Sequence, residues 1–421
     1  MIIYNLFPLL AGRFTQWTPH LERAADMEFD WIFVNPIQKP GKSGSLYSIA
    51  DYFDYHPRLI DRSASETAAD QVKAALRTAR KLDLRVMTDL VVNHSAFDSA
   101  LTKQHPEWYV QKQGRIEHPF CIEDGQKVVW HDLARFDYEH GRDPEGLYAY
   151  LARVVRHLLE LGFEGFRCDA AYQVPTPIWR RLITEVKADH PDACFVAETL
   201  GCTPDETRDT AAAGFDYVFN SSKYWNFHDH WLMEQYNLVR EQVGSIGFPE
   251  SHDTPRLMEE THGNVDALQQ RYLFSALFSA GVMTLMGFEF GFRNKPHVVH
   301  TEPDDWEETD VDLRKFIRKV NRLKSAHQVF NEEAPTHLLH CDNSQVLLMW
   351  KGATGSRDEA LVILNKDIHG RQDFWAQDLR SYVQSGAKLR CESPQNPMDH
   401  VAQPFHYQLR PGEAVVLVTE R

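Results

Sequence analysis

Hydrophobic and polar positions follow a regular rhythm along most of the chain. Short apolar runs that end in polar residues are followed by longer stretches in which apolar residues recur at helical spacing. The short runs predict eight strands, at residues 2–8, 31–37, 85–94, 164–169, 194–199, 215–220, 245–253 and 282–289. The stretches between them predict helices, among them 66–82, 145–161 and 176–189. Eight strand–helix units are the number that closes a (β/α)8 TIM barrel.

An open, doubly wound parallel sheet would show the same alternation of strands and helices. Such sheets often carry a GxGxxG turn after the first strand, and the first predicted strand here is not followed by one. We therefore predict an α/β fold built on a TIM barrel.

Two segments depart from this rhythm. Residues 95–143 are too long for a simple connection between the third and fourth strands, and they predict a small subdomain at the rim of the barrel. Residues 333–421 contain short alternating runs separated by turn residues, which predict a C-terminal antiparallel β-sandwich. The catalytic barrel would then consist of residues 1–94 and 144–332.

Composition and charge narrow the functional classes. The chain has 421 residues, 43% of them hydrophobic, which is enough to bury a large core. Its net charge of −15 argues against nucleic acid or an anionic membrane as a partner, and no apolar run reaches the length of a membrane span. The cysteines show no CxxC spacing, so we expect reduced thiols in a cytoplasmic protein. The six are Cys121, Cys168, Cys194, Cys202, Cys341 and Cys391.

Charged residues stand at the end of the fourth predicted strand. Arg167 and Asp169 are two positions apart and therefore share one face of the strand. Burying both is costly unless they pair or take part in chemistry. The carboxyl ends of barrel strands carry the active site. Other polar residues at such ends are Asp89, Asn93, His94, Glu198, His252 and Asp253.

Three carboxylates, Asp169, Glu198 and Asp253, would thus converge at one opening. Cleavage or transfer of a glycosidic bond uses such a set, because one acid protonates the leaving oxygen while another attacks the anomeric carbon. A single one of them could equally be an ion-paired or capping residue. We interpret Asp89 and Asn93 as structural residues that hold the end of the third strand by hydrogen bonds.

Four segments resemble the signature segments of the α-amylase superfamily, glycoside hydrolase family 13. They are DLVVNH (89–94), GFRCDAAY (165–172), FVAE (195–198) and PESHD (249–253). The resemblance implies that Asp169 is the nucleophile, Glu198 the general acid/base and Asp253 the transition-state stabiliser. It also implies a retaining enzyme that hydrolyses or transfers α-1,4-linked glucosyl units of α-glucans or maltooligosaccharides. We expect the anions Asp169 and Asp253 to raise the pKa of Glu198 by repulsion.

The same resemblance implies the contacts to the substrate. Arg167 would keep Asp169 ionised, since a nearby positive charge favours the carboxylate. Two histidines, His94 and His252, would donate hydrogen bonds to sugar hydroxyls.

Two further segments bear on the substrate contacts. GSLYSIADYFDYHP (44–57) is similar to the family's loop after the second strand, which implies that Tyr47 stacks on the sugar and Asp51 supports it. Tyr172 and Gln173 stand where amylases that act within long chains often carry Lys-His. We expect Tyr172 to contact the substrate, without the leaving-side contacts that Lys-His makes in those amylases.

No cofactor is required for this chemistry, and we predict no metal site. Asn93 resembles a calcium ligand of many amylases, but Gln173 replaces the histidine that usually supplies another ligand. The histidine pairs in 227–230 and 297–300 have no evident third ligand, which argues against a metal-dependent hydrolase.

Two alternatives remain for the activity. Segments 105–109, 179–204 and 214–227 resemble the maltosyltransferases that extend α-1,4-glucan from maltose 1-phosphate, although FPESHDTPR (248–256) departs from their usual fourth segment. A non-catalytic sugar-binding or transporter-associated relative is less favoured, because the three carboxylates and Arg167 are all present.

Overall fold

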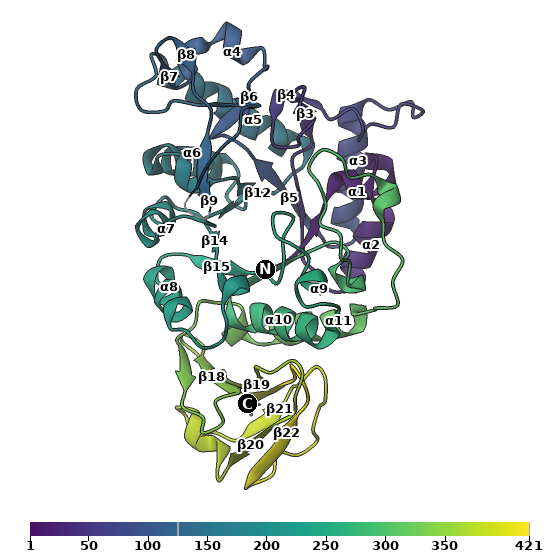
Figure 1. Ribbon diagram of the computed structural model, residues 1–421, viewed down its shortest axis with the longest axis vertical. Helices are drawn as coiled ribbons and strands as arrows, with labels where there is room; N and C mark the ends of the chain where they lie inside the picture. Colours follow the sequence, from purple (N-terminus) through teal and green to yellow (C-terminus); the bar gives the residue numbers. More distant parts are fainter. Residues whose placement is uncertain (124–125, 421) are drawn as a thin grey trace.

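The computed structural model describes residues 1–123 and 126–420, and it contains a closed barrel of eight parallel strands (Figure 1). The order around the barrel is β1-β16-β15-β14-β13-β12-β5-β2. Each strand falls on one of the predicted apolar runs, so the TIM-barrel prediction is confirmed. The strands are β1 (Ile2–Leu6), β2 (Trp31–Val34), β5 (Arg85–Leu90), β12 (Gly165–Cys168), β13 (Cys194–Ala197), β14 (Tyr217–Phe219), β15 (Gly244–Gly247) and β16 (Gly281–Leu285).

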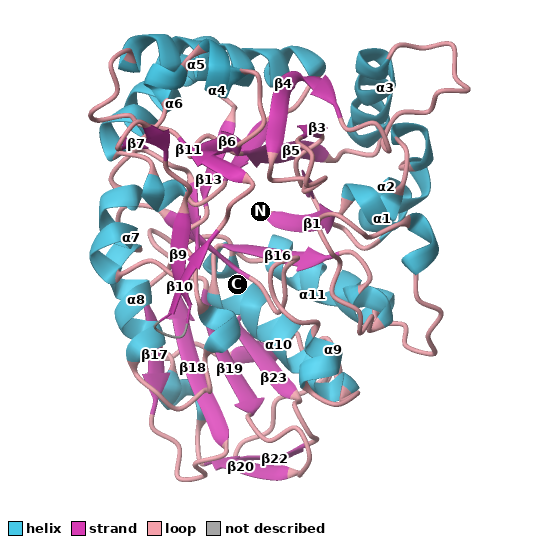
Figure 2. Cartoon of the chain, turned by 45° about the horizontal axis from the view of Figure 1, so that its top comes forward, coloured by secondary structure: helices cyan, strands magenta, loops and turns pink. Residues whose placement is uncertain are grey.

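Helices surround these strands, as Figure 2 shows. Their apolar faces pack with the outward-facing strand residues into one large core. A second cluster, which includes Ile3, Trp31, Phe33 and Met283, fills the interior of the barrel. The main helices are α2 (Thr18–Asp26), α3 (Ala68–Lys81), α5 (Pro144–Leu161), α6 (Thr176–Asp189), α7 (Pro204–Ala211), α8 (Trp231–Val239), α10 (Val265–Phe278) and α11 (Arg314–Ala326), with short helices α1 (Pro8–Ala11) and α9 (Leu257–Glu260).

Helix α5 illustrates how local sequence sets the boundaries of these helices. The Asp143 side chain accepts a hydrogen bond from the Gly146 N–H, and Pro144 occupies the first turn, where its missing N–H costs nothing. The helix ends at Gly162, whose φ of 112° is in the region that favours glycine. The predicted helix over 145–161 is therefore confirmed almost to the residue.

The segment between β5 and β12 forms small antiparallel pairs above the barrel (Figure 1). Strand β6 follows β5 directly and pairs with β11, which brings the rim segment back to the end of the third barrel strand. The elements are β6 (His94–Ala96), α4 (Leu101–Gln104), β7 (Gln111–Lys112), β8 (Arg115–Ile116), β9 (Phe120–Glu123), β10 (Gln126–Val129) and β11 (Leu133–Arg135). A further pair, β3 (Gln38–Pro40) and β4 (Ile49–Tyr55), follows β2.

The C-terminal part contains two antiparallel sheets, as predicted. One face of the larger sheet packs on the smaller sheet around Leu348, Ile363 and Phe374, and its other face joins the core of the barrel through residues such as Met349 and Val362. The larger sheet is β17 (Thr336–Leu339), β18 (Val346–Gly352), β19 (Glu359–Asn365), β23 (Ala414–Thr419) and β21 (Leu389–Cys391), and the smaller is β20 (Gln372–Ala376) and β22 (Phe405–Leu409).

The state of the cysteines can be compared with the prediction of reduced, buried thiols. Cys168 and Cys194 are buried as predicted, and the cysteines whose side chains are described are free thiols. The side chain of Cys121 lies outside the described residues.

In the described part of the chain, none of the helices combines the length and hydrophobicity that a membrane crossing requires.

Candidate active site

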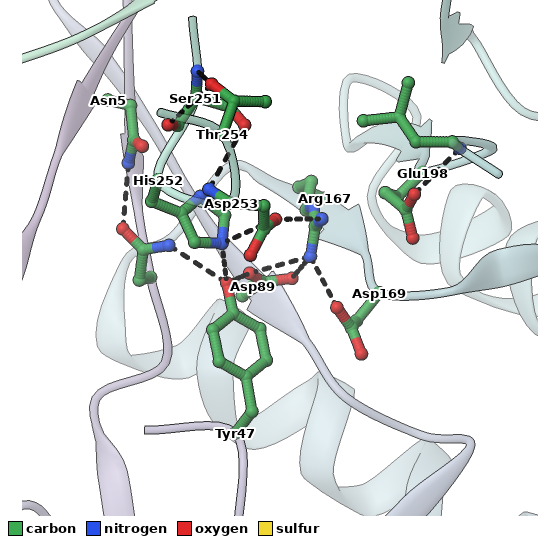
Figure 3. Close-up of polar contacts among 12 residues, drawn as sticks. Asn5, Tyr47, Asp89, Arg167, Asp169, Glu198, Ser251, His252, Asp253 and Thr254 are labelled. Atoms are coloured by element: carbon green, nitrogen blue, oxygen red, sulfur yellow. Dashed lines mark hydrogen bonds and ion pairs between the residues drawn. The ribbon is translucent and has the colours of Figure 1, made fainter. Parts of the chain in front are cut away.

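Arg167 is the centre of a cluster of charged residues at the carboxyl end of the barrel (Figure 3). Its Nη1 donates to both carboxylate oxygens of Asp89, at 3.0 Å each, and to Oδ1 of Asp169 at 2.7 Å. Its Nη2 lies 3.9 Å from Oδ2 of Asp253. The parallel register of β12 and β5 places Arg167 directly opposite Asp89. The buried charges at the end of the fourth strand are therefore paired, which offsets the cost of their burial.

The ionisation of the buried pair follows from opposing influences. Burial lowers the pKa of Arg167, but Asp89, Tyr47 and Asp169 raise it more, so that it lies well above its usual value. Burial raises the pKa of Asp89, and the positive charge of Arg167 opposes this rise. Arg167 thus serves two carboxylates rather than Asp169 alone.

Glu198 lies directly after β13, beside Asp169. Its Oε2 accepts a hydrogen bond from the Ala170 N–H and its Oε1 one from the Leu200 N–H, both at 2.8 Å. Burial raises the pKa of Glu198 to about 7, while Arg167 opposes the rise and Asp169 and Asp253 add to it. The direction agrees with the prediction, but burial contributes more than the repulsion that we expected to be the cause.

A tight turn brings the Asp169 and Glu198 segments together. Ala170 adopts a left-handed conformation with φ 40° and ψ 48°, so the chain reverses immediately after Asp169. The Ala171 N–H then donates to the Glu198 carbonyl at 3.1 Å, and the Glu198 N–H donates to the Cys168 carbonyl at 3.0 Å. These backbone bonds hold the two carboxylates on neighbouring strand ends.

Asp253 is the exposed member of the cluster, with 56% of its side chain accessible to solvent. His252 beside it is buried, and its Nε2 lies 3.1 Å from Oδ2 of Asp253. Burial lowers the pKa of His252 to about 4, so this imidazole is neutral at physiological pH. Asp253 is thus exposed at the carboxyl end of the barrel, next to the buried His252.

The hydroxyl group of Tyr47, like Arg167, is contacted by several side chains of the cluster. It lies 2.6 Å from Oδ2 of Asp89, 2.6 Å from Nε2 of His252 and 2.9 Å from Nδ2 of Asn35. Asn35 in turn accepts a hydrogen bond from Asn5 Nδ2 at 2.9 Å. Neither asparagine was predicted from the sequence as a site residue. Asn5 lies in the middle of the first predicted strand (2–8) but next to the last residue of β1, and Asn35 directly follows β2, so only the second asparagine had the signal of a polar residue at a strand end.

The remaining predicted contact residues lie at different depths. His94 is buried, and its Nε2 makes a 3.0 Å hydrogen bond with the carbonyl of Tyr47. Tyr172 is partly buried in the 3-10 turn after Asp169, and burial raises its pKa to about 12. Asp51 is exposed and accepts from the Phe53 N–H at 2.9 Å. The support that we expected Asp51 to give Tyr47 comes instead from the partners of the Tyr47 hydroxyl.

Asn93 is the residue that resembles a calcium ligand of the amylases. Its Oδ1 is buried and makes no hydrogen bond among the described residues, and its Nδ2 lies 3.5 Å from Oε1 of Gln173. Calcium takes six to eight oxygen ligands, usually including carboxylates. In the described part of the chain, no three His, Cys, Asp or Glu side chains gather into a possible metal site. Among the described side chains, Asn93 therefore offers one buried amide oxygen without an accompanying cluster of carboxylates.

Comparisons with known proteins add to this geometry. A family model described as the glucanotransferase domain of glycogen debranching enzyme matches residues 1–113. The α-1,4-glucan:maltose-1-phosphate maltosyltransferase of Burkholderia pseudomallei is 24% identical over 377 residues, which cover 85% of this chain and 32% of the relative. The protein of the same name from Mycobacterium tuberculosis is 24% identical over 405 residues, 86% of this chain and 54% of the relative. The chain therefore spans about a third of the length of the first relative and about half of the length of the second.

Solved structures of α-amylases share the fold. The α-amylase of Geobacillus thermoleovorans, in complex with acarbose, has a TM-score of 0.79 at 14% identity, over 100% of this chain and 98% of the other. An α-amylase from Lactobacillus plantarum has a TM-score of 0.76 at 20% identity, with the same coverage. Both likenesses include the barrel and the C-terminal sheets.

Proposed function

We propose that this chain, which has the fold of the α-amylase superfamily and is a distant homologue of the α-1,4-glucan:maltose-1-phosphate maltosyltransferases, is a retaining enzyme that acts on α-glucans. It would hydrolyse or transfer α-1,4-linked glucosyl units of glucans or maltooligosaccharides. One observation carries the proposal: Arg167 holds Asp169 at the carboxyl end of the barrel, within reach of Asp253 and beside a Glu198 whose pKa is about 7.

In the first step, a carboxylate oxygen of Asp169 attacks the anomeric carbon of the sugar. Glu198 gives its proton to the glycosidic oxygen as the bond to the leaving group breaks. A pKa near 7 suits this role, because at neutral pH a large fraction of the group is protonated and can give its proton up. The negative charge of Asp253 stabilises the oxocarbenium-like transition state.

In the second step, Glu198 accepts a proton from water or from a sugar hydroxyl. The resulting nucleophile attacks the anomeric carbon and breaks its bond to Asp169, so that Asp169 leaves as a carboxylate and Glu198 is again protonated. Hydrolysis and transfer differ only in this acceptor. Tyr47, His94, His252 and Tyr172 are assigned to contacts with the sugar.

A fluorinated sugar tests the role of Asp169. A 5-fluoro α-glucosyl fluoride should trap the covalent intermediate, and mass spectrometry of the digested protein should find the label on the peptide that contains Asp169. The Asp169→Asn variant should take up no label. The matched control is Asp342→Asn, at a fully exposed aspartate of the C-terminal part, which should be labelled like the wild type. Label on Glu198 or Asp253 would overturn these roles.

Maltosyl transfer from maltose 1-phosphate is the second candidate. Its support is the sequence similarity to the maltosyltransferases of two organisms, which extends over 85% and 86% of this chain. Product analysis on maltooligosaccharides, with and without maltose 1-phosphate, separates the candidates. Phosphate release with chain extension by two glucose units indicates maltosyl transfer. Shorter products in water indicate hydrolysis, and redistribution among chain lengths indicates transfer between glucans. No product under any of these conditions would contradict the proposed function.

A further inference from the structure

A chain of hydrogen bonds links four neighbouring strands of the barrel to the candidate active site (Figure 3). It begins at Asn5 on β1, passes through Asn35 after β2 and the hydroxyl of Tyr47, and reaches Asp89 on β5 and Arg167 on β12. The strands β1, β2, β5 and β12 are consecutive around the barrel. Asn5 and Asn35 are both 0% exposed. Two buried amides with no contact to solvent need a reason to be there.

The orientation of both amides follows from the chemistry of their partners. Asn5 Nδ2 donates to the Phe33 carbonyl at 3.1 Å, and a carbonyl can only accept. The nitrogen of Asn5 therefore faces Asn35, which must present its oxygen. Asn35 is then left with its Nδ2 pointing at Tyr47, so the Tyr47 oxygen has to accept that hydrogen bond.

The orientation of the two amides also determines which group accepts the proton of the Tyr47 hydroxyl. Arg167 donates to both oxygens of Asp89, which makes this carboxylate an acceptor. The Tyr47 O–H therefore donates to Asp89, at 2.6 Å. His252 must then donate from Nε2 to the Tyr47 oxygen or to Asp253, because Tyr47 has no second proton to offer. The Nδ1 of His252 is left without a hydrogen, and it is buried with no hydrogen-bond partner among the described residues.

We propose that Asn5 and Asn35 are positioning residues: they orient the Tyr47 hydroxyl so that its proton points to Asp89 and the Nε2–H of His252 points toward Asp253. The pair thereby keeps Asp89 a charged acceptor, and Asp89 in turn holds Arg167 against Asp169. This inference rests on the proposed function for its effect on rate, while the arrangement of protons can be measured without any substrate.

The Asn35→Asp variant tests the direction of the chain. The new carboxylate keeps its bond from Asn5 but cannot donate to Tyr47, so it competes with Asp89 for the Tyr47 proton. Losing a hydrogen bond in a charged network predicts a fall in kcat of roughly 10- to 100-fold at neutral pH. As the pH is lowered, the new carboxyl group takes up a proton and can donate again. The ratio of variant to wild-type activity should therefore rise toward acid pH.

A matched control separates this effect from a loss of packing. Asn321 in α11 is also 0% exposed, accepts from the Tyr272 hydroxyl at 2.7 Å and donates to the Met27 carbonyl at 2.9 Å. Asn321→Asp should lower stability, with an activity ratio that does not rise toward acid pH. A flat ratio for Asn35→Asp as well would overturn the proposal.

A double-mutant cycle covers the case in which Asn35→Asp does not fold. Asn35→Ser shortens the side chain and breaks the link to Tyr47, and Tyr47→Phe removes the hydroxyl that receives it. If the asparagine acts through that hydroxyl, Asn35→Ser should cost little in the Tyr47→Phe background. Losses that simply multiply would show that Asn35 acts by another route.

A measurement without substrate tests the positioning role of Asn5 and Asn35 independently of the proposed function. In 15N-histidine NMR, with His252 assigned from the spectrum of His252→Asn, the neutral ring should carry its proton on Nε2. The Asn35→Asp variant should shift this resonance. A proton on Nδ1 in the wild type would overturn the proposed direction, whatever the activity. An inactive protein with the Nε2–H form would instead contradict the proposed function alone.

Discussion

Glu198 shows how the environment of one carboxyl group sets its chemistry. Its oxygens accept backbone hydrogen bonds from Ala170 and Leu200, which favours the anion, while burial favours the neutral acid. Burial is the larger influence, and the pKa of about 7 leaves the group poised to give and take a proton at neutral pH.

The raised pKa of Glu198 also makes a prediction about stability. The folded protein keeps this proton up to a pH of about 7, whereas the unfolded chain loses it near the usual glutamate pKa of 4.5. The folded state therefore binds more protons between these values, and the contribution of Glu198 to stability falls as the pH rises through this range. Glu198→Gln removes the effect, so it should raise the free energy of unfolding relative to the wild type by up to about 3 kcal/mol at pH 8 and little at pH 4.5.

Chemical denaturation at the two pH values measures this difference. The control is Glu308→Gln, at an exposed glutamate, for which the difference from the wild type should not change with pH. A Glu198→Gln variant with the same difference at both pH values would show that burial does not raise the pKa of Glu198.

At the scale of the element, β12 combines packing and chemistry on one face. Gly165, Arg167 and Asp169 alternate along the same side of the strand. A Cβ at Gly165 would lie 2.9 Å from the Cys194 carbonyl oxygen and 3.1 Å from the ring of Trp31. The glycine leaves room for the Trp31 ring below the charged residues, so the barrel floor and the site share this strand.

Gly165→Ala should therefore disturb both the packing of the barrel floor and the candidate active site. Overpacking predicts a loss of about 1–3 kcal/mol in the free energy of unfolding. It also predicts a lower kcat, because the strand that carries Arg167 and Asp169 must shift. Thermal unfolding and initial rates measure the two effects. The double variant Gly165→Ala/Trp31→Phe removes the crowded part of the indole and should recover part of both, whereas no recovery would place the strain at the Cys194 backbone alone.

At the scale of the whole molecule, a buried lysine of the C-terminal sheet, Lys351, contacts a helix end of the barrel, and a buried lysine of the barrel, Lys324, contacts the same helix end. Lys351 on β18 donates to the carbonyls of Leu277 and Phe278, at 3.1 and 2.6 Å, and Lys324 on α11 donates to that of Ala276 at 2.8 Å. These carbonyls belong to the last turn of α10, which has no further N–H groups to satisfy them. Figure 1 shows α10 directly above the C-terminal sheet that supplies Lys351.

The buried position of Lys351 predicts a stability that depends on pH. Burial lowers its pKa from 10.5 to about 8, so between these values the unfolded chain binds more protons than the folded protein. Stability from this group therefore rises as the pH increases from 8 to 10.5. Relative to Lys351→Met, the wild type should gain up to about 3 kcal/mol over this range.

Denaturant unfolding at pH 7.5 and pH 10 measures the gain. The exposed Lys388→Met, in the same C-terminal part, should show no comparable gain. An unchanged difference between the wild type and Lys351→Met would mean that Lys351 keeps its usual pKa despite its burial.

The sequence by itself determined the barrel, the C-terminal sheets and the positions of the charged strand ends. Periodicity is a local property, and each apolar run followed by a polar end states which residues are inside and where the strand stops. The comparisons confirm the superfamily fold implied by the four signature segments. Arg167 and Asp169 could be placed on one face because two residues on a strand always share a side.

Only the tertiary structure decided which polar groups meet. Asn5, Asn35 and Tyr47 are connected because β1, β2 and the loop after β2 are neighbours in space, and their spacing in the sequence carries no sign of a shared hydrogen bond. The same holds for Lys351, which reaches a helix end 73 residues away in the chain. The pKa of Glu198 depends mainly on its burial, and every segment packed around the side chain contributes to that burial. Pairing and burial depend on the closed order of the strands around the barrel, and no single stretch of sequence contains that order.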